Sequence, residues 1–176
     1  MPTLTTSHAQ TLAHIRALVF GPPRVGKTFS SLTLSEHCPV DLTSVRPSVA
    51  PSREPVDLPD MLWLAFDNGA TTGFAQAKVN VPLIDLSGVP AADIVKETLD
   101  SLRLAAERVK AGTTKVVVMD TISALDEKLY TLSGVTKGLE KLDLFGQLKT
   151  DHLRIAQAYP HLRCHLLFLC HAKAKT

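Results

Sequence analysis

Four short segments of the chain are apolar at almost every position, and longer stretches of mixed polarity separate them. The four segments are Ile15–Phe20, Met61–Phe66, Lys115–Met119 and Cys164–Cys170. Strands that are covered on both faces have nearly continuous apolar runs, because neither face is left for polar residues. We therefore predict four buried strands, with Val81–Leu86 as a weaker fifth candidate.

The stretches between the strands show a helical period. One of them carries apolar residues at steps of four and three, which places them on one stripe of a helix. These residues are Val95, Leu99, Leu102, Ala106 and Val109. Pro90 can open this helix and Gly112 can close it. A second helix is predicted from about Leu142 to Ala158 and a short one over Lys27–Glu36, and such alternation of strands and helices indicates a parallel α/β sheet.

The segment from Pro39 to Pro59 interrupts this pattern. Its prolines are Pro39, Pro47, Pro51, Pro55 and Pro59. Proline blocks helices and lacks a backbone donor, so the segment is predicted to be a loop. Loops of this length are either functional or disordered, and we favour disorder. We expect a single domain over residues 1–176 with a flexible loop at 39–60.

Length, composition and charge narrow the class of protein. The chain has 176 residues, 45% of them hydrophobic, and no apolar run approaches the roughly 18 residues that a membrane span needs. Met1–Gln10 lacks the features of a secretory signal, so we expect a soluble cytoplasmic protein. Cys38, Cys164 and Cys170 show no C-x-x-C spacing and are expected to be buried reduced thiols. A net charge of +2 does not by itself indicate a nucleic-acid-binding protein.

The segment Gly21–Thr28 carries the clearest chemical signal. It reads G-P-P-R-V-G-K-T and matches G-x-x-x-x-G-K-[ST] between a predicted strand and a predicted helix. Its glycines allow backbone amides to surround a phosphate, and the dipole of the following helix favours the anion. Lys27 would reach the β- and γ-phosphates, and Thr28 offers a hydroxyl to Mg²⁺. The alternative is a chance match in an ordinary turn.

We therefore predict a P-loop that binds ATP with Mg²⁺. The nucleotide-binding residues are expected to be Gly21, Pro22, Pro23, Arg24, Val25, Gly26, Lys27, Thr28 and Phe29. Asp120 ends an apolar run and would lie at the carboxyl edge of the sheet, where it can hold the metal's water shell together with Thr28. The alternative for Asp120 is a cap on the next turn.

Beyond the phosphate motif, the chain resembles a known family. Val117–Leu125, V-V-M-D-T-I-S-A-L, resembles the second nucleotide motif of RecA-type ATPases, in which a hydroxyl residue follows the strand-end Asp. Asp143–Gln147, a helix, and Leu166–Lys173 are similar to bacteriophage RecA-like ATPases linked to single-strand annealing and recombination. The resemblance covers residues 15–173 and implies a three-layer α/β P-loop core with a mainly parallel RecA-like sheet.

The resemblance also implies roles for single residues. His171 would sense the γ-phosphate, and its alternative is a histidine that caps a buried strand; His165 is expected to be structural. Asp67 would polarise the attacking water, although family members commonly carry Glu there, which leaves the efficiency of hydrolysis open. The alternative for Asp67 is an Asp-Asn-Gly turn without chemistry. The expected catalytic set is Lys27, Asp67, Asp120 and His171, with Lys173 and Lys175 as conceivable trans-acting groups or a solvated tail.

The function implied is an ATPase that acts on single-stranded DNA in recombination, replication or repair, in a bacterial or phage-infected cell. A homo-oligomer and a single-strand binding protein stay open as partners. The chain stops six residues after Cys170, where RecA-like cores normally continue, so we expect a fragment or a minimal core. Two alternatives share the phosphate site: a nucleotide or small-molecule kinase, although residues 39–59 hold only Arg46 and Arg53, and a nucleotide-binding interaction module without efficient hydrolysis.

Overall fold

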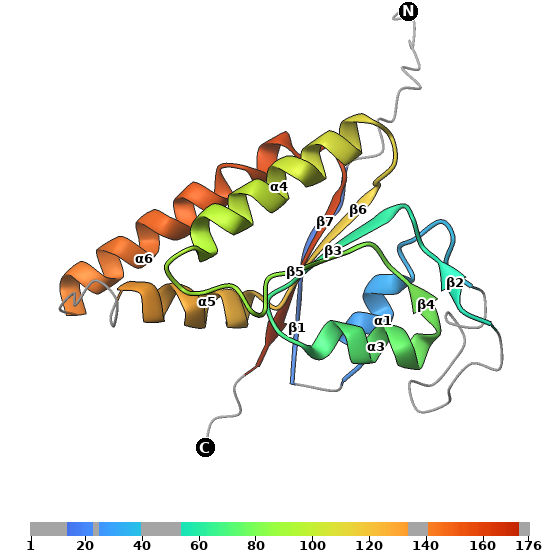
Figure 1. The fold of residues 1–176 in the computed structure, drawn as a ribbon, viewed down its shortest axis with the longest axis horizontal. Helices are drawn as coiled ribbons and strands as arrows, with labels where there is room; N and C mark the ends of the chain where they lie inside the picture. The colour runs from blue at the N-terminus through green and yellow to red at the C-terminus, as the bar shows by residue number, and fades with distance from the viewer. Residues whose placement is uncertain (1–13, 23–24, 40–53, 134–140, 173–176) are drawn as a thin grey trace, which may run out of the picture.

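The computed structural model describes residues 14–22, 25–39, 54–133 and 141–172, and it is built around a sheet of five parallel strands in the order β1-β7-β6-β3-β5 (Figure 1). The strands are β1 (Arg16–Gly21), β3 (Met61–Ala65), β5 (Leu83–Asp85), β6 (Val116–Asp120) and β7 (His165–His171). Every pairing in this sheet is parallel. All five predicted strands are present, and the predicted parallel α/β sheet is confirmed.

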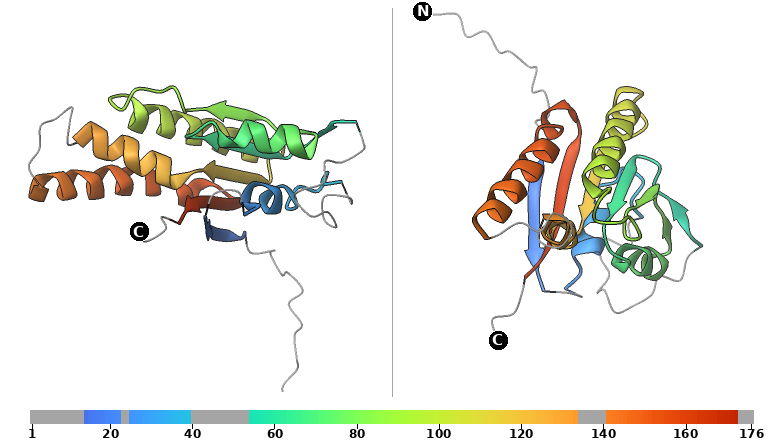
Figure 2. Two further views of the ribbon diagram at one scale, coloured as in Figure 1. Left: turned by 90° about the horizontal axis from the view of Figure 1, so that it is seen from below. Right: turned by 60° about the vertical axis from the view of Figure 1, so that its left-hand side comes forward.

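Helices cover both faces of the sheet (Figures 1 and 2). On one face lie α4 (Ile94–Lys110), α5 (Ile122–Thr131) and α6 (Lys141–Ala156), and on the other lie α1 (Lys27–Leu32) and α3 (Gly69–Ala77). The central strands alternate between two apolar clusters, so that Leu62 and Leu64 of β3 pack toward α4 while Met61 and Trp63 pack toward α3. This arrangement confirms the three-layer fold.

The carboxyl ends of the parallel strands meet at one edge of the sheet. Gly21, Asp120 and His171 are the last residues of β1, β6 and β7, and Asp67 lies two residues after the end of β3. β7 separates β1 from β6, with Gly21 in register with His171 and Asp120 with Leu169. Four strands therefore end at the same edge, where β3, β6 and β7 bring together the predicted polar residues Asp67, Asp120 and His171.

The first strand differs from the prediction in its burial. β1 lies at the edge of the sheet, and its residues alternate between exposed and half-buried. Leu18 is 64% exposed and Phe20 is 68% exposed. Ala17 and Val19 pack against the cluster beneath α1 and α3. The prediction that this strand is covered on both faces is wrong, because an apolar run shows that a strand is apolar but not which neighbours it has.

Helix boundaries depart from the prediction in three places. α4 begins at Ile94 rather than at Pro90, because residues 91–93 form a turn in which Asp93 N donates to Pro90 O at 3.0 Å. It ends as predicted, with Gly112 at a φ of 74°. α1 ends at Leu32, four residues before the predicted end, because buried Asp60 accepts hydrogen bonds from the Ser35 hydroxyl and the Glu36 amide. α6 covers residues 141–156 rather than 142–158.

Several elements were not predicted. α3 and α5 fall outside the predicted helices, and a second small sheet pairs β2 (Val56–Asp57) with β4 (Val79–Asn80). β2 lies inside the segment predicted to be a loop, so that prediction is wrong for Val56 and Asp57. Residues 40–53 of the same segment lie outside the described residues. α3 contains glycines and threonines that favour helix weakly, and its burial of Phe74 against Trp63 stabilises it instead.

Two broader expectations can be compared with the described part of the chain. No helix within it combines the length and the apolar character needed to cross a bilayer. The three cysteines form no disulfide, with Cys164 buried and Cys38 and Cys170 half-buried. Burial raises the pKa of the Cys164 thiol to about 11.

Candidate functional site

The phosphate-loop residues surround the amino terminus of α1. Gly26 has φ 89° and ψ 16°, a left-handed conformation that favours glycine. A Cβ at Gly21 would lie 3.0 Å from Cγ2 of Val25, so the loop packs closely on itself there. Pro22 and Val25 are exposed, whereas Pro23 and Arg24 lie outside the described residues. Both glycines of the motif therefore serve a backbone that a larger residue would disturb.

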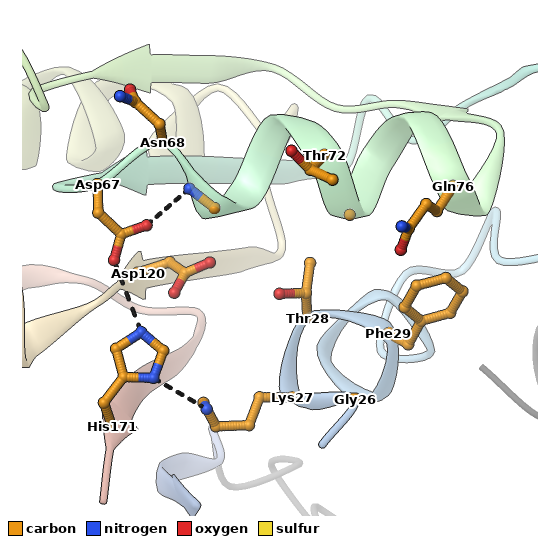
Figure 3. Close-up of a pocket in the computed structure, with 12 residues that line it drawn as sticks. Gly26, Lys27, Thr28, Phe29, Asp67, Asn68, Thr72, Gln76, Asp120 and His171 are labelled. Carbon is orange, nitrogen blue, oxygen red and sulfur yellow. Dashed lines mark hydrogen bonds and ion pairs between the residues drawn. The ribbon is translucent and has the colours of Figure 1, made fainter. Parts of the chain in front are cut away.

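Lys27 holds its ammonium group inside the loop. The residue is 8% exposed, and its Nζ donates to the carbonyl oxygens of Gly21 at 3.0 Å and Pro22 at 2.9 Å. The same Nζ lies 3.3 Å from Nδ1 of His171 (Figure 3). Two neutral carbonyl oxygens therefore satisfy the ammonium, and a phosphate oxygen can replace them with a stronger charge-assisted hydrogen bond.

The surroundings of Asp120 disfavour its charged form. It is 4% exposed, and its Oδ2 accepts a hydrogen bond from Nε1 of Trp63 at 3.2 Å. Burial, and then the negative charge of Asp67, raise the pKa of Asp120 to about 6, while Trp63 and Lys27 oppose that rise. A carboxylate in this position gains from any cation placed beside it.

Asp67 takes part in a turn and in the site at once. Its Oδ1 accepts from the backbone amide of Gly69 at 2.8 Å, which forms the predicted Asp-Asn-Gly turn and starts α3. Its Oδ2 accepts from Oγ1 of Thr121 at 3.0 Å, and Nε2 of His171 lies 3.8 Å from the same oxygen. The structural and the chemical alternatives for Asp67 are therefore compatible.

His171 contacts both Lys27 and Asp67. Its backbone amide donates to Oγ of Ser123 at 3.0 Å, which fixes the end of β7 beside the start of α5. Its ring lies between the ammonium of Lys27 and the carboxylate of Asp67 (Figure 3). His165, by contrast, accepts a hydrogen bond from the amide of Ile15 through Nδ1 at 3.1 Å. This contact joins the start of β7 to the residue before β1, and His165 is not part of the described cavity lining.

These side chains line one open cavity of ≈ 740 Å³ (Figure 3). Its described lining consists of Gly26, Lys27, Thr28, Phe29, Asp67, Asn68, Gly69, Thr72, Gly73, Gln76, Asp120 and His171. The four residues predicted to be catalytic and the two predicted to bind metal are all in this set. Lys173 and Lys175 lie outside the described residues.

The residues contributed by α3 were missed at the level of sequence. Gly69, Thr72, Gly73 and Gln76 follow the spacing of one helical face, but two glycines conceal the helix itself. A Cβ at Gly73 would lie 2.8 Å from Cγ2 of Thr28, so glycine permits the close approach of α3 and α1. Trp63 was predicted only as a strand residue, and nothing in the pattern indicated its hydrogen bond to Asp120.

Comparison with known proteins supports the fold. Neither a protein-family model nor a curated protein sequence matches the chain. One matching solved structure is a prototypical ATPase from the type III secretion system of pathogenic bacteria, with a TM-score of 0.59 and 11% sequence identity. The match covers 93% of this chain and 46% of that ATPase. At this identity the likeness shows a shared fold, and it adds no support for the narrower resemblance to bacteriophage ATPases.

Proposed function

We propose that this chain is a Mg²⁺-dependent ATPase whose active site is the cavity of ≈ 740 Å³ at the carboxyl edge of the sheet. The observation that carries the proposal is that Lys27, Thr28, Asp67, Asp120 and His171, which come from distant parts of the chain, line this one cavity. The distant fold match to an ATPase points the same way.

The phosphate tail is proposed to bind at the loop of Gly21 and Gly26. Its oxygens would replace the carbonyls that now accept from Nζ of Lys27, and the exchange would give the buried ammonium an anionic partner. Because α1 has only six residues, the loop amides and Lys27 contribute more to this binding than the helix dipole does. Phosphate recognition of this kind does not depend on the base.

The donor set at the same place suits magnesium. Thr28 supplies a hydroxyl oxygen and Asp120 a carboxylate, and within the described residues no group of three or more His, Cys, Asp and Glu side chains forms a metal cage. Mg²⁺ usually takes one or two protein ligands and completes its shell with water and substrate phosphates. We expect Thr28 and Asp120 to hold the ion, which would neutralise charge on the phosphates.

Hydrolysis would use the residues opposite the loop. A water molecule attacks the γ-phosphorus, the bond from that phosphorus to the β-γ bridging oxygen breaks, and ADP and phosphate leave. Asp67 lines the cavity, and we expect its carboxylate to orient the water and accept its proton. His171, between Lys27 and Asp67, would hydrogen-bond the γ-phosphate and thereby respond to its loss.

Turnover of ATP by purified protein tests this proposal. We expect Mg²⁺-dependent release of phosphate that falls by at least about tenfold in Lys27→Ala, Asp67→Ala and Asp120→Asn. Asp93→Asn, which replaces an exposed carboxylate outside the cavity, is the matched control and should retain the rate of the parent protein. Equal turnover in all variants would show that the activity belongs to a contaminant or to another site.

On the basis of the family resemblance, we propose that the protein couples hydrolysis of ATP to an action on single-stranded DNA. We expect DNA to stimulate turnover of ATP and to do so less as salt rises, because phosphate contacts release counterions. The same assay with and without a single-stranded oligonucleotide measures the effect. An absence of both stimulation and binding would remove the DNA role and leave the nucleotide site intact.

One observation favours a second candidate, a nucleotide-binding module with little hydrolysis. Both carboxylate oxygens of Asp67 already accept hydrogen bonds, from Gly69 and from Thr121, which reduces their ability to activate water. Tight ATP binding, together with slow turnover that Asp67→Ala leaves unchanged, would identify this candidate. Loss of binding in Lys27→Ala is expected for both.

A further inference from the structure

The cavity has a charged end and a neutral end. Lys27, Asp67, Asp120 and His171 gather at one side, and Phe29 and Gln76 lie at the other (Figure 3). These four are the only ionisable side chains in the described lining. A nucleoside triphosphate has the same division, with an anionic tail and a neutral base, so its orientation in the cavity follows from charge.

The neutral end is formed by one face of α3 and the first turn of α1. Thr72 and Gln76 are four residues apart on α3 and therefore lie on one face, about 6 Å apart along the helix axis. Both are exposed to the cavity, while Gly73 beside them brings α3 against Thr28. Gln76 is about 10 Å along the helix from Gly69, which leaves room for a sugar between the phosphates and the amide.

Two side chains at this end have the chemistry of base recognition. The ring of Phe29 is half-buried, packed at the edge of the apolar cluster, and also lines the cavity. Aromatic rings bind bases by stacking without regard to their identity. The amide of Gln76 carries both a donor and an acceptor, a pair that matches the N6 and N7 edge of adenine but not the two acceptors of guanine at O6 and N7.

We infer that this neutral end is a base-binding subsite in which Phe29 stacks on the base and Gln76 selects adenine over guanine. The inference rests on the proposed function, because the phosphate site must place the base here. Thr72 offers a hydroxyl one turn before Gln76 and suits a sugar hydroxyl. No arginine or lysine, the residues that pair with guanine, occurs in the described lining at this end.

The test compares three probes in the presence of Mg²⁺ by titration calorimetry: ATPγS, GTPγS and inorganic tripolyphosphate. Tripolyphosphate occupies the phosphate site without a base and so reports on that site alone. We expect the parent protein to bind ATPγS about tenfold or more tightly than GTPγS. Gln76→Ala should abolish this preference with no change for tripolyphosphate, and Gln76→Arg should reverse the preference between the two nucleotides.

Two further variants separate stacking from selection. Phe29→Leu keeps an apolar side chain but removes the ring, and should weaken both nucleotides about tenfold while tripolyphosphate binds as before. Thr71→Ala changes an exposed residue of α3 outside the cavity lining and should change nothing. Circular dichroism confirms that each variant is folded, and Gln76 is exposed enough to be replaced safely.

The outcomes distinguish the subsite from the phosphate site. Binding of all three probes with equal affinity for the two nucleotides, or a preference that survives Gln76→Ala, would overturn the subsite and leave the proposed function standing. Failure of tripolyphosphate and both nucleotides to bind would overturn both proposals together.

Discussion

Replacing Asp120 by asparagine should make the metal-free protein more stable while it removes turnover of ATP. Asp120 is buried beside Asp67, and both features disfavour its charged form. Asparagine has nearly the same shape, and its carbonyl can still accept the hydrogen bond that Nε1 of Trp63 donates. The substitution therefore removes the cost of a buried charge and little else.

The magnitude follows from the pKa of the carboxyl group in the two states. The pKa rises from 3.8 to about 6 on folding. A group whose pKa is raised in the folded state contributes its full stability below the unfolded value and loses it as pH rises through the folded value. Above pH 6 the loss amounts to roughly 3 kcal/mol. For a domain of this size that is roughly 6–12 °C in Tm.

Urea denaturation in the presence of a chelator measures the effect. Asp120→Asn should exceed the parent protein by roughly 3 kcal/mol at pH 8, by about half of that at pH 5, and by well under about 1 kcal/mol at pH 4. The exposed Asp93→Asn is the control and should stay within about 0.5 kcal/mol of the parent at each pH. A variant no more stable than the parent at pH 8, or a difference in stability that does not change with pH, would show that the buried charge of Asp120 does not destabilise the fold.

Three other predictions concern packing and reactivity. Gly73→Ala should weaken Mg-ATP binding by about tenfold in calorimetry, because the added Cβ would press on Thr28. Gly146→Ala in α6 is the matched substitution, because a Cβ there meets no atom within 4 Å. It should increase the free energy of unfolding by about 0.5–1 kcal/mol. Trp63→Phe should move the acid limb of the activity profile to higher pH, because it removes a hydrogen bond that lowers the pKa of Asp120 and so raises that pKa. An acid limb at the same pH in the variant would contradict this link between Trp63 and Asp120. At pH 8, iodoacetamide should alkylate the buried Cys164, whose pKa is about 11, more slowly than the half-buried Cys38. Unfolding in urea should remove this difference. Equal alkylation rates in the folded protein would contradict the burial of Cys164.

The strands and the phosphate loop could be predicted because their signals are local. A continuous apolar run such as Val116–Asp120 indicates a covered strand by itself, and the spacing of Gly21, Gly26 and Lys27 carries its own chemistry. The strand ends then place Asp67 and His171 at one edge without any knowledge of distances.

The rest depends on contacts between distant segments. α3 is a helix because Phe74 packs on Trp63, and no local preference of its glycines and threonines predicts that. The early end of α1 depends on Asp60, which lies 25 residues after Ser35. Exposure of Phe20 depends on which strand lies at the sheet's edge. The cavity wall made by α3 was missed for the same reason.

Titration of the protein with ATPγS in the presence of Mg²⁺, by calorimetry, shows whether the cavity binds a nucleoside triphosphate. We expect saturable binding at one site per chain, and a loss of at least about tenfold in affinity when Lys27 is replaced by alanine. A folded parent protein that binds neither ATPγS nor GTPγS under these conditions would contradict this expectation.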